Sequence, residues 1–251
     1  MVNGQMKIYV ITHKKIDLNL PPEYKLLSVG AYNGTEDGMY SDQIEESISS
    51  KNYCFCELTG LYWIWKNQAE DIMGLVHYRR FFYKGNKLLS KKIIDKALQN
   101  HDIILPKKAY LRESNAKHYL ACGYEKDLQT LKKVIIEKYP EMEKTFDSYF
   151  NSYQTYYYNM MITSEAIFKE YCSWLFDILF EVEKRIDISS YPDYQKRIFG
   201  FMSERLLNIF VLYRNLNVKE YPVYRSDSSA YSRWKGNFKN NIKFIFSRFK
   251  R

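Results

Sequence analysis

The sequence predicts an α/β protein with a mostly parallel central sheet, a helical second half and a basic amphipathic helix at the C-terminal end. Short apolar runs alternate with segments of helical spacing in the first half of the chain, which is typical of strands joined by helices. No repeat or low-complexity linker interrupts the chain before residue 227. With 251 residues the chain can bury a core of its own. We therefore expect one domain over residues 1–227 and a tail over residues 228–251.

The first half contains four predicted strands and two predicted helices. Apolar runs bounded by polar or turn residues predict strands at residues 6–14, 25–34, 71–78 and 101–108. Pro106 ends the last of these runs, because proline lacks the N–H that a sheet needs. Apolar residues at helical spacing predict the two helices at residues 54–67 and 90–98, the second capped by Ser90.

The second half is richer in helical patterns. A helix is expected over residues 128–139, ended by Pro140, and two longer apolar helices over residues 165–184 and 199–215. The tyrosine-rich run at residues 156–163 and the run at residues 218–225 predict the remaining strands.

The tail has a composition of its own. Residues 228–251 contain no acidic residue, and their aromatic and basic side chains fall on neighbouring arcs of a helix. This pattern is typical of a helix that lies in an anionic membrane surface. The alternative is a helix packed on the domain with a solvated basic edge. The membrane-facing candidates are Trp234, Lys235, Phe238, Lys239, Ile242, Lys243 and Phe249.

Charge and cysteine content limit the classes of binding partner that we expect for this protein. The net charge of +9 favours anionic partners such as phosphorylated substrates or a membrane surface. A nucleic acid is not expected, since no nucleic-acid-binding motif is present. No apolar run is long enough to span a bilayer, and the four cysteines lack a disulfide or zinc-ribbon spacing. We expect a cytoplasmic protein, held peripherally at the membrane by its tail.

Cationic and polar side chains follow three of the predicted strands. In open α/β sheets ligands bind beyond the carboxyl ends of the strands, and converging cations suit a phosphate or diphosphate. The two arginines could instead bridge Asp71 or Glu57 structurally. The candidates for donor binding at these strand ends are Thr12, His13, Lys14, His77, Tyr78, Arg79, Arg80 and Lys107.

The usual phosphate-binding and metal-binding sequences are missing. No glycine-rich phosphate loop follows a predicted strand, and no Asp-x-Asp pair ends one. His13 and His77 could ligate a divalent metal such as Mn²⁺ or Mg²⁺ together with a carboxylate. Hydrogen bonding is the more usual role of a lone histidine, so no cofactor is assigned and the metal requirement stays open.

A second polar cluster lies in the predicted helix at residues 199–215. Arg197, Glu204 and Asn208 share one helical face in apolar surroundings, where a charge is costly unless it is paired or functional. Glu204 is the first candidate for a general base and Asp193 the second. The alternative is a structural ion pair between Glu204 and Arg197 or Arg205.

Six ordered segments resemble one bacterial family: CELTGLYWIWKN, GLVHYRRFF, DIILPKK, YNMMIT, YCSWLFDILFEVE and RIFGFMSERLLNIF. The resemblance extends over residues 7–224 and is to the glycosyltransferases of capsular and exopolysaccharide gene clusters, long catalogued as an uncharacterised domain. It implies a GT-A-like fold and a hexosyltransferase that uses a UDP-sugar donor and a lipid-linked oligosaccharide acceptor. Some members are galactosyl- or galactofuranosyltransferases.

The resemblance also bears on site residues. Family members usually carry Asp-Asn where this chain has Glu46-Ser47, so donor preference can differ, while Lys51 and Asn52 are kept as donor-site candidates. We assign Tyr158, Asn159 and Arg197 to the acceptor sugar. Two other classes stay open: a catalytically inactive, membrane-docked scaffold of a polysaccharide assembly complex, and a nucleic-acid-binding module.

Overall fold

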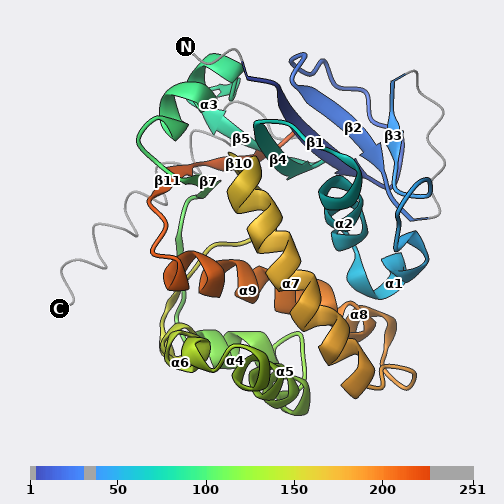
Figure 1. The fold of residues 1–251 in the computed structure, drawn as a ribbon, viewed down its shortest axis with the longest axis vertical. Coiled ribbons are helices and arrows are strands. Elements are labelled where there is room, and N and C mark those ends of the chain that lie inside the picture. Colours follow the sequence, from blue (N-terminus) through green and yellow to red (C-terminus); the bar gives the residue numbers. More distant parts are fainter. Residues whose placement is uncertain (1–3, 31–37, 227–251) are drawn as a thin grey trace.

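The computed structural model describes residues 4–30 and 38–226, and its centre is a mixed, mostly parallel sheet (Figure 1). The strands follow the order β11-β7-β10-β4-β1-β2-β3 across the sheet. Their bounds are β1 Met6–Thr12, β2 Tyr24–Ser28, β3 Tyr40–Ser41, β4 Ile72–His77, β7 Ile103–Pro106, β10 Met161–Ser164 and β11 Val218–Tyr221. The α/β fold class and the mostly parallel sheet are therefore confirmed.

One strand of this order, β10, runs antiparallel to both of its neighbours, β4 and β7. The reason lies in the chain between β7 and β10. The short strands β8 (Ala109–Tyr110) and β9 (Gln154–Thr155) pair antiparallel directly after β7 and directly before β10. The chain thus leaves the sheet after β7 and returns to it beside the segment by which it left. As a result, β10 runs in the direction opposite to β7.

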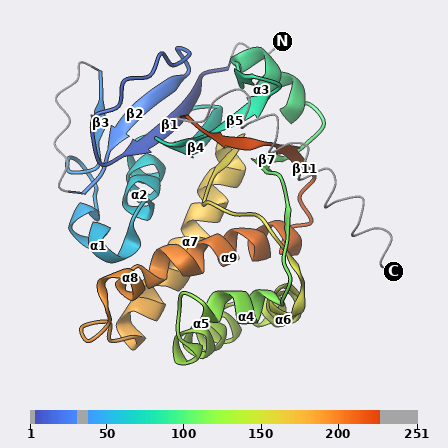
Figure 2. The same ribbon diagram turned by 180° about the vertical axis from the view of Figure 1, so that it is seen from behind.

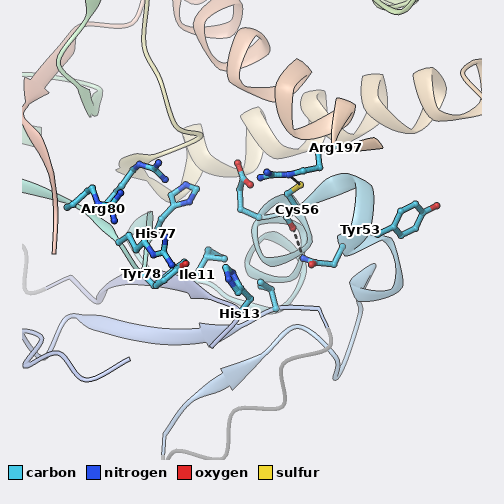
Figure 3. A pocket seen from close by; sticks show the side chains of 13 residues that line it. Ile11, His13, Tyr53, Cys56, His77, Tyr78, Arg80 and Arg197 are labelled. Atoms are coloured by element: carbon cyan, nitrogen blue, oxygen red, sulfur yellow. Dashed lines mark hydrogen bonds between the residues drawn. The ribbon is translucent and has the colours of Figure 1, made fainter. Parts of the chain in front are cut away.

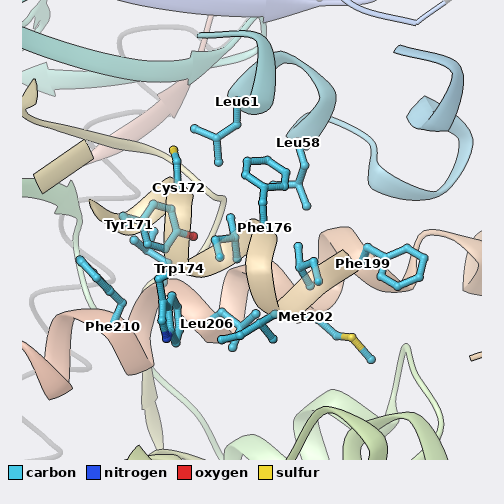
Figure 4. Close-up of a cluster of buried hydrophobic side chains, with 14 of the residues drawn as sticks. Leu58, Leu61, Tyr171, Cys172, Trp174, Phe176, Phe199, Met202, Leu206 and Phe210 are labelled. Atoms are coloured by element: carbon cyan, nitrogen blue, oxygen red, sulfur yellow. The ribbon is translucent and has the colours of Figure 1, made fainter. Parts of the chain in front are cut away.

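Strand side chains alternate between two apolar layers, as the pleat of a sheet requires. In β1, Tyr9 and Ile11 face one core, while Ile8 and Val10 face the other. Helices α2 (Leu58–Asn67), α7 (Glu165–Arg185) and α9 (Ile198–Tyr213) form the first core with the sheet. Figure 4 shows Leu58 and Leu61 of α2 above the side chains of α7 and α9.

The opposite face is covered by α3 (Lys91–Leu98) and by the strands β5 (Arg80–Lys84), β6 (Lys87–Leu88) and β12 (Val223–Arg225). Away from the sheet, α4 (Asn115–Leu120), α5 (Glu125–Lys138) and α6 (Glu143–Asn151) form a helical layer beyond α9 (Figure 2). Two short helices, α1 (Asn52–Phe55) and α8 (Asp193–Lys196), lie near the carboxyl ends of β1 and β2.

Four sequence-based predictions need correction. The predicted helix at residues 54–67 is two helices, α1 and α2, because the chain turns at Cys56, which has φ 54°. The run at residues 218–225 is two strands, because Pro222 separates β11 from β12, which pairs with β5 instead. The run at 156–163 becomes a strand only from Met161, where β10 (Met161–Ser164) begins, since Tyr158 has a positive φ of 72°. Arg80 does not follow a strand into a loop, because it begins β5 after a tight turn.

The strand predicted at residues 25–34 is shorter, because β2 ends at Ser28. Other expectations fall outside the described residues, namely the tail helix at 228–251 with its domain boundary and residues 31–34 of that predicted strand. Among the helices of residues 4–30 and 38–226, none has the length and apolar character needed to cross a membrane.

Helix α9 is tied to the chain before β10 through one buried amide. The side chain of Asn208 accepts from the Tyr156 N–H at 2.7 Å and donates to the Tyr156 carbonyl at 2.9 Å. It also donates to the Glu204 carbonyl one turn back. The buried Tyr156 N–H therefore depends on this side chain, while the Tyr156 carbonyl also accepts from the Thr155 hydroxyl at 3.3 Å.

Replacing Asn208 by Ala should leave the buried Tyr156 N–H unpaired and lower the free energy of unfolding by about 1–3 kcal/mol. Urea denaturation measures this as a lower midpoint at an unchanged slope. The control is Asn151→Ala at the exposed end of α6, where we expect a change within about 0.5 kcal/mol. Equal midpoints for the two variants would contradict the anchoring role.

Candidate functional site

A cavity of about 470 Å³ lies at the carboxyl ends of β1 and β4, which is where ligands bind in open α/β sheets. His13 follows β1, and His77 is the last residue of β4. Figure 3 shows Arg80 and His77 on one side of this space and Cys56 and Arg197 across from them. The lining residues are Ile11, His13, Val29, Asn52, Tyr53, Cys56, Glu57, His77, Tyr78, Arg79, Arg80, Arg197 and Arg225.

Four arginines and one carboxylate, Glu57, line this cavity. Within residues 4–30 and 38–226, neither Arg79 nor Arg80 forms an ion pair with a carboxylate. Each guanidinium lies over a ring instead: Arg79 over Tyr78 at 4.9 Å and Arg80 over Tyr158 at 4.6 Å from the ring centre. A ring orients an arginine without cancelling its charge. The cavity is therefore electropositive.

The geometry does not show Arg79 and Arg80 as structural partners of Asp71 or Glu57. Asp71 accepts a hydrogen bond from the Gln5 N–H at 2.7 Å, and Glu57 accepts one from the Asn159 side chain at 2.7 Å. Neither carboxylate bridges Arg79 or Arg80 in the described part of the chain. The guanidinium groups keep their donors for another acceptor.

The two histidines of the cavity are held in the neutral form. Burial lowers the pKa of His13, and the nearby charges of Lys14, Arg79 and Arg197 lower it further. Burial also lowers the pKa of His77; Glu57 opposes this shift and Arg80 adds to it. The Nε2 atom of His77 is buried and has no hydrogen-bond partner among the described residues. A ligand in the cavity could supply that partner.

Glu57 is presented by an unusual turn between α1 and α2. Cys56 has φ 54° and ψ −128°, a conformation that is costly for a residue with a side chain. Asn52 holds it from both sides: the Cys56 N–H donates to the Asn52 carbonyl at 2.9 Å, and the Asn52 amide donates to the Cys56 carbonyl at 2.8 Å. The turn reverses the chain so that Glu57 starts α2 with its side chain at the cavity.

The same turn carries the Cys56 thiol. The Arg197 Nε–H donates to its sulfur at 3.1 Å, which fixes the guanidinium at the cavity wall. Burial, with a smaller effect of Glu57, raises the pKa of Cys56 to about 11, so the thiol is protonated near neutral pH. Gly30 packs closely behind Asn52, because a Cβ there would lie 2.6 Å from the Asn52 Oδ1 atom.

The chain before β10 holds both Arg80 and Glu57 in place. Tyr158 sits at φ 72°, and its N–H donates to the Glu204 carboxylate at 3.2 Å. Its neighbour Asn159 donates to Glu57 and accepts from the Ser203 hydroxyl at 2.9 Å. Tyr158 and Asn159 thus contact the lining residues from behind.

Glu204 is part of this support and does not line the cavity. It forms an ion pair with Arg205 at 2.9 Å, and its side chain keeps 23% of its exposure. Burial raises its pKa, while the Arg205 charge opposes the shift. Asp193 lies elsewhere, fully exposed at the start of α8 with Lys196 at 3.3 Å.

The structure brings together about half of the predicted site residues. His13, Asn52, His77, Tyr78, Arg79, Arg80 and Arg197 line the cavity. Four others have different contacts. The buried Thr12 hydroxyl bonds to the backbone of Lys14, and the Lys14 ammonium lies over Tyr78. Lys51 pairs with Glu183, and the Lys107 N–H bonds to the Tyr221 carbonyl.

Sequence reasoning did not assign Cys56, Glu57, Tyr53 or Arg225 to a site. The CELT segment gave no sign that a positive φ at its cysteine would turn the glutamate toward the strand ends. For the suggested metal, no three His, Cys, Asp or Glu side chains gather as a metal site within the described residues.

Comparison with known proteins adds independent evidence about the fold. The structure matches a solved structure described as the apo form of WbbM, a bifunctional glycosyltransferase, with a TM-score of 0.79 and 29% identity. The match covers 89% of this chain and 46% of that one, so the chain spans about half the length of WbbM. It also supports the expected GT-A-like fold. No curated protein matches the chain.

The family assignment comes from the sequence as a whole. Residues 7–215 match the family described as a domain of unknown function, DUF4422. The matched range includes most of the cavity lining, from Ile11 to Arg197. Since this range is well over half of the chain, the protein belongs to the DUF4422 family.

Proposed function

We propose that the protein is a glycosyltransferase that transfers a hexose from a nucleotide-sugar donor, with a UDP-sugar as the expected donor class. The observation that carries this proposal is the cavity at the strand ends. Its lining combines Arg79 and Arg80, which form no ion pair with a carboxylate within residues 4–30 and 38–226, with the carboxylate of Glu57. The similarity to a bifunctional glycosyltransferase supports it, because the match includes 89% of the chain.

The arginines are the expected partners of the donor diphosphate. Guanidinium groups bind phosphoryl oxygens through paired hydrogen bonds, and Arg79 and Arg80 have donors to spare. The Nε2 atom of His77, which has no hydrogen-bond partner among the residues that the structure describes, adds a third group that a phosphoryl oxygen could meet. Negative charge builds on this diphosphate as the sugar leaves, so the same cations would stabilise the transition state.

Glu57 is the proposed general base. It is the carboxylate in the cavity lining, and the Asn159 amide fixes its orientation at 2.7 Å. In the reaction its carboxylate takes the proton of the acceptor hydroxyl. The hydroxyl oxygen then forms a bond to the anomeric carbon as the bond from that carbon to the diphosphate breaks, and the nucleoside diphosphate leaves with the bonding electrons.

Glu204 and Asp193 were the candidates that the sequence favoured for this role. The contacts of Glu204 with the Tyr158 N–H and with Arg205 suit a positioning role, because Tyr158 in turn stacks on Arg80. The exposed Asp193 lies at the start of α8, outside the cavity lining. We therefore place Glu57 ahead of both.

The biological setting follows the sequence resemblance. We propose a lipid-linked oligosaccharide acceptor in capsular or exopolysaccharide synthesis, with galactose or galactofuranose as the transferred sugar. The basic tail at residues 228–251 would hold the enzyme at the cytoplasmic membrane face, near such an acceptor.

The first test is a thermal-shift panel of UDP, GDP, CMP and their sugars, each with EDTA and with manganese. A ligand that binds the native state alone raises the melting temperature. We expect UDP and one UDP-sugar to do so in EDTA. A response that requires manganese would still support a glycosyltransferase and would indicate His13 and His77 as metal ligands. No response to any nucleotide would favour the alternative, a catalytically inactive, membrane-docked scaffold of a polysaccharide assembly complex.

Replacing Arg79 or Arg80 by Ala should weaken UDP binding by about tenfold or more, since a hydrogen bond to a charged group contributes about 1.5–3 kcal/mol. Isothermal titration calorimetry measures the affinity, and the melting temperature should change little. Arg112→Ala is the matched control, because this exposed arginine lies outside the cavity lining. A large loss of stability at normal affinity would assign the arginines a structural role.

Replacing Glu57 by Gln should lower turnover by about 100-fold or more while UDP still binds, because the amide cannot accept the proton. The readout is transfer from the donor identified by the panel, to water or to an acceptor. Asp193→Asn and Glu204→Gln serve as comparisons in the same assay. If one of them abolishes turnover at unchanged stability and Glu57→Gln does not, the base is that residue.

A further inference from the structure

A second cavity of about 440 Å³ adjoins the first and has a different chemistry. It lies between the C-terminal end of α7, the loop after it and the start of α9. Its lining residues are Tyr53, Glu183, Ile186, Asp187, Ile188, Ser189, Lys196 and Phe199. None of them is an arginine, so this cavity is a poor match for a diphosphate.

The two cavities share one wall. Tyr53 lines both of them, and its side chain is 62% exposed. On the other side, two consecutive residues at the junction of α8 and α9 divide between the cavities: Lys196 lines the second and Arg197 the first. In Figure 3 the Tyr53 ring extends away from the other labelled side chains of the first cavity. A molecule in the second cavity would therefore border the first.

The lining of the second cavity combines oriented acceptors with an apolar floor. Glu183 is held by Lys51, whose ammonium lies 2.6 Å from its Oε2 atom. Asp187 accepts from the Ser189 N–H at 2.8 Å, and this bond lowers the pKa of its carboxyl group. Both carboxylates are thus held in place by a hydrogen-bond donor, and each has lone pairs left for another donor.

The apolar part comes from Phe199, Ile186 and Ile188, which pack against the first core. A pyranose ring presents hydroxyl groups at its edge and C–H groups on its faces. Carboxylates can accept from the hydroxyls, while the exposed Tyr53 ring offers a surface for a sugar face. An uncharged sugar fits this mixture better than an anion does.

We propose that the second cavity binds the terminal sugar of the acceptor glycan and presents its hydroxyl to the first cavity past Tyr53. This assignment rests on the proposed function, because a transferase needs a second substrate beside the donor. It revises the acceptor assignment drawn from the sequence, since Tyr158 and Asn159 contact the first cavity from behind and Arg197 lines it.

Two adjacent serines provide the test. Ser189 lines the second cavity and Ser190 does not, and both are exposed in the same turn. Ser189→Trp should fill the cavity with an indole, and Ser190→Trp is the matched control. The probes are the methyl pyranosides of galactose, glucose, mannose, rhamnose and N-acetylglucosamine. Their binding is measured by saturation-transfer-difference NMR with and without saturating UDP.

We expect at least one methyl pyranoside to give a signal that persists with UDP, is lost in Ser189→Trp and is kept in Ser190→Trp. Unchanged melting temperatures confirm that both variants fold. Three results would overturn the assignment: no signal from any probe, a signal that UDP displaces, or a signal that Ser189→Trp keeps.

These outcomes are separable from the proposed function. Failure of UDP to bind, with a pyranoside signal that still depends on residue 189, would remove the donor assignment and leave a sugar-binding cavity. Normal UDP binding without a pyranoside signal would remove the acceptor subsite alone.

Discussion

Mutual repulsion among the arginines of the first cavity is the constraint on which the rest of the site depends. Like charges in a partly buried space destabilise the folded state unless something offsets them. Carboxylates would offset them, but they would also occupy the donors that an anionic ligand needs. Here the rings of Tyr78 and Tyr158 orient two of the arginines and leave their charge available. Part of the tyrosine-rich composition therefore has a specific role, which is to orient arginines at this cavity.

Such an arrangement needs a rigid support, because repelled side chains otherwise move apart. Helix α9 provides it on one side through Asn208, Ser203 and Glu204, which all bond to residues 156–159. The Cys56 turn provides it on the other side. Both segments include non-glycine residues at positive φ, Tyr158 and Cys56, which persist only where the surrounding contacts determine them. Strained backbone therefore occurs beside Arg79 and Arg80, which have no carboxylate partner in the described part of the chain, and the apolar core under α2, α7 and α9 stabilises this arrangement.

The sequence predicted the repeating parts of this structure well. Period-two and helical spacing located β1, β4, β7, α2, α7 and α9 because these elements are buried on a regular face. The direction of β10 could not be predicted, since it depends on the pairing of β8 with β9, two strands of two residues each. The strand ends correctly indicated His77, Arg79 and Arg80 as neighbours of a cavity. That Glu57 lines the cavity was not predicted, because its placement depends on one backbone conformation at Cys56, for which cysteine gives no local signal.

The two cavities differ in charge although they share a wall, and this difference suggests how two substrates would be kept in order. The first is lined by four arginines, and the second by fixed carboxylates, Lys196 and an apolar floor. An anionic donor would be attracted more by the first set than by the second, where Lys51 pairs with Glu183, and an uncharged sugar would not be drawn to the arginines. Lys196 and Arg197 are consecutive, so a shift at the α8–α9 junction would alter both cavities together. The geometry of this junction, more than the identity of any one lining residue, would then set the distance between the two substrates.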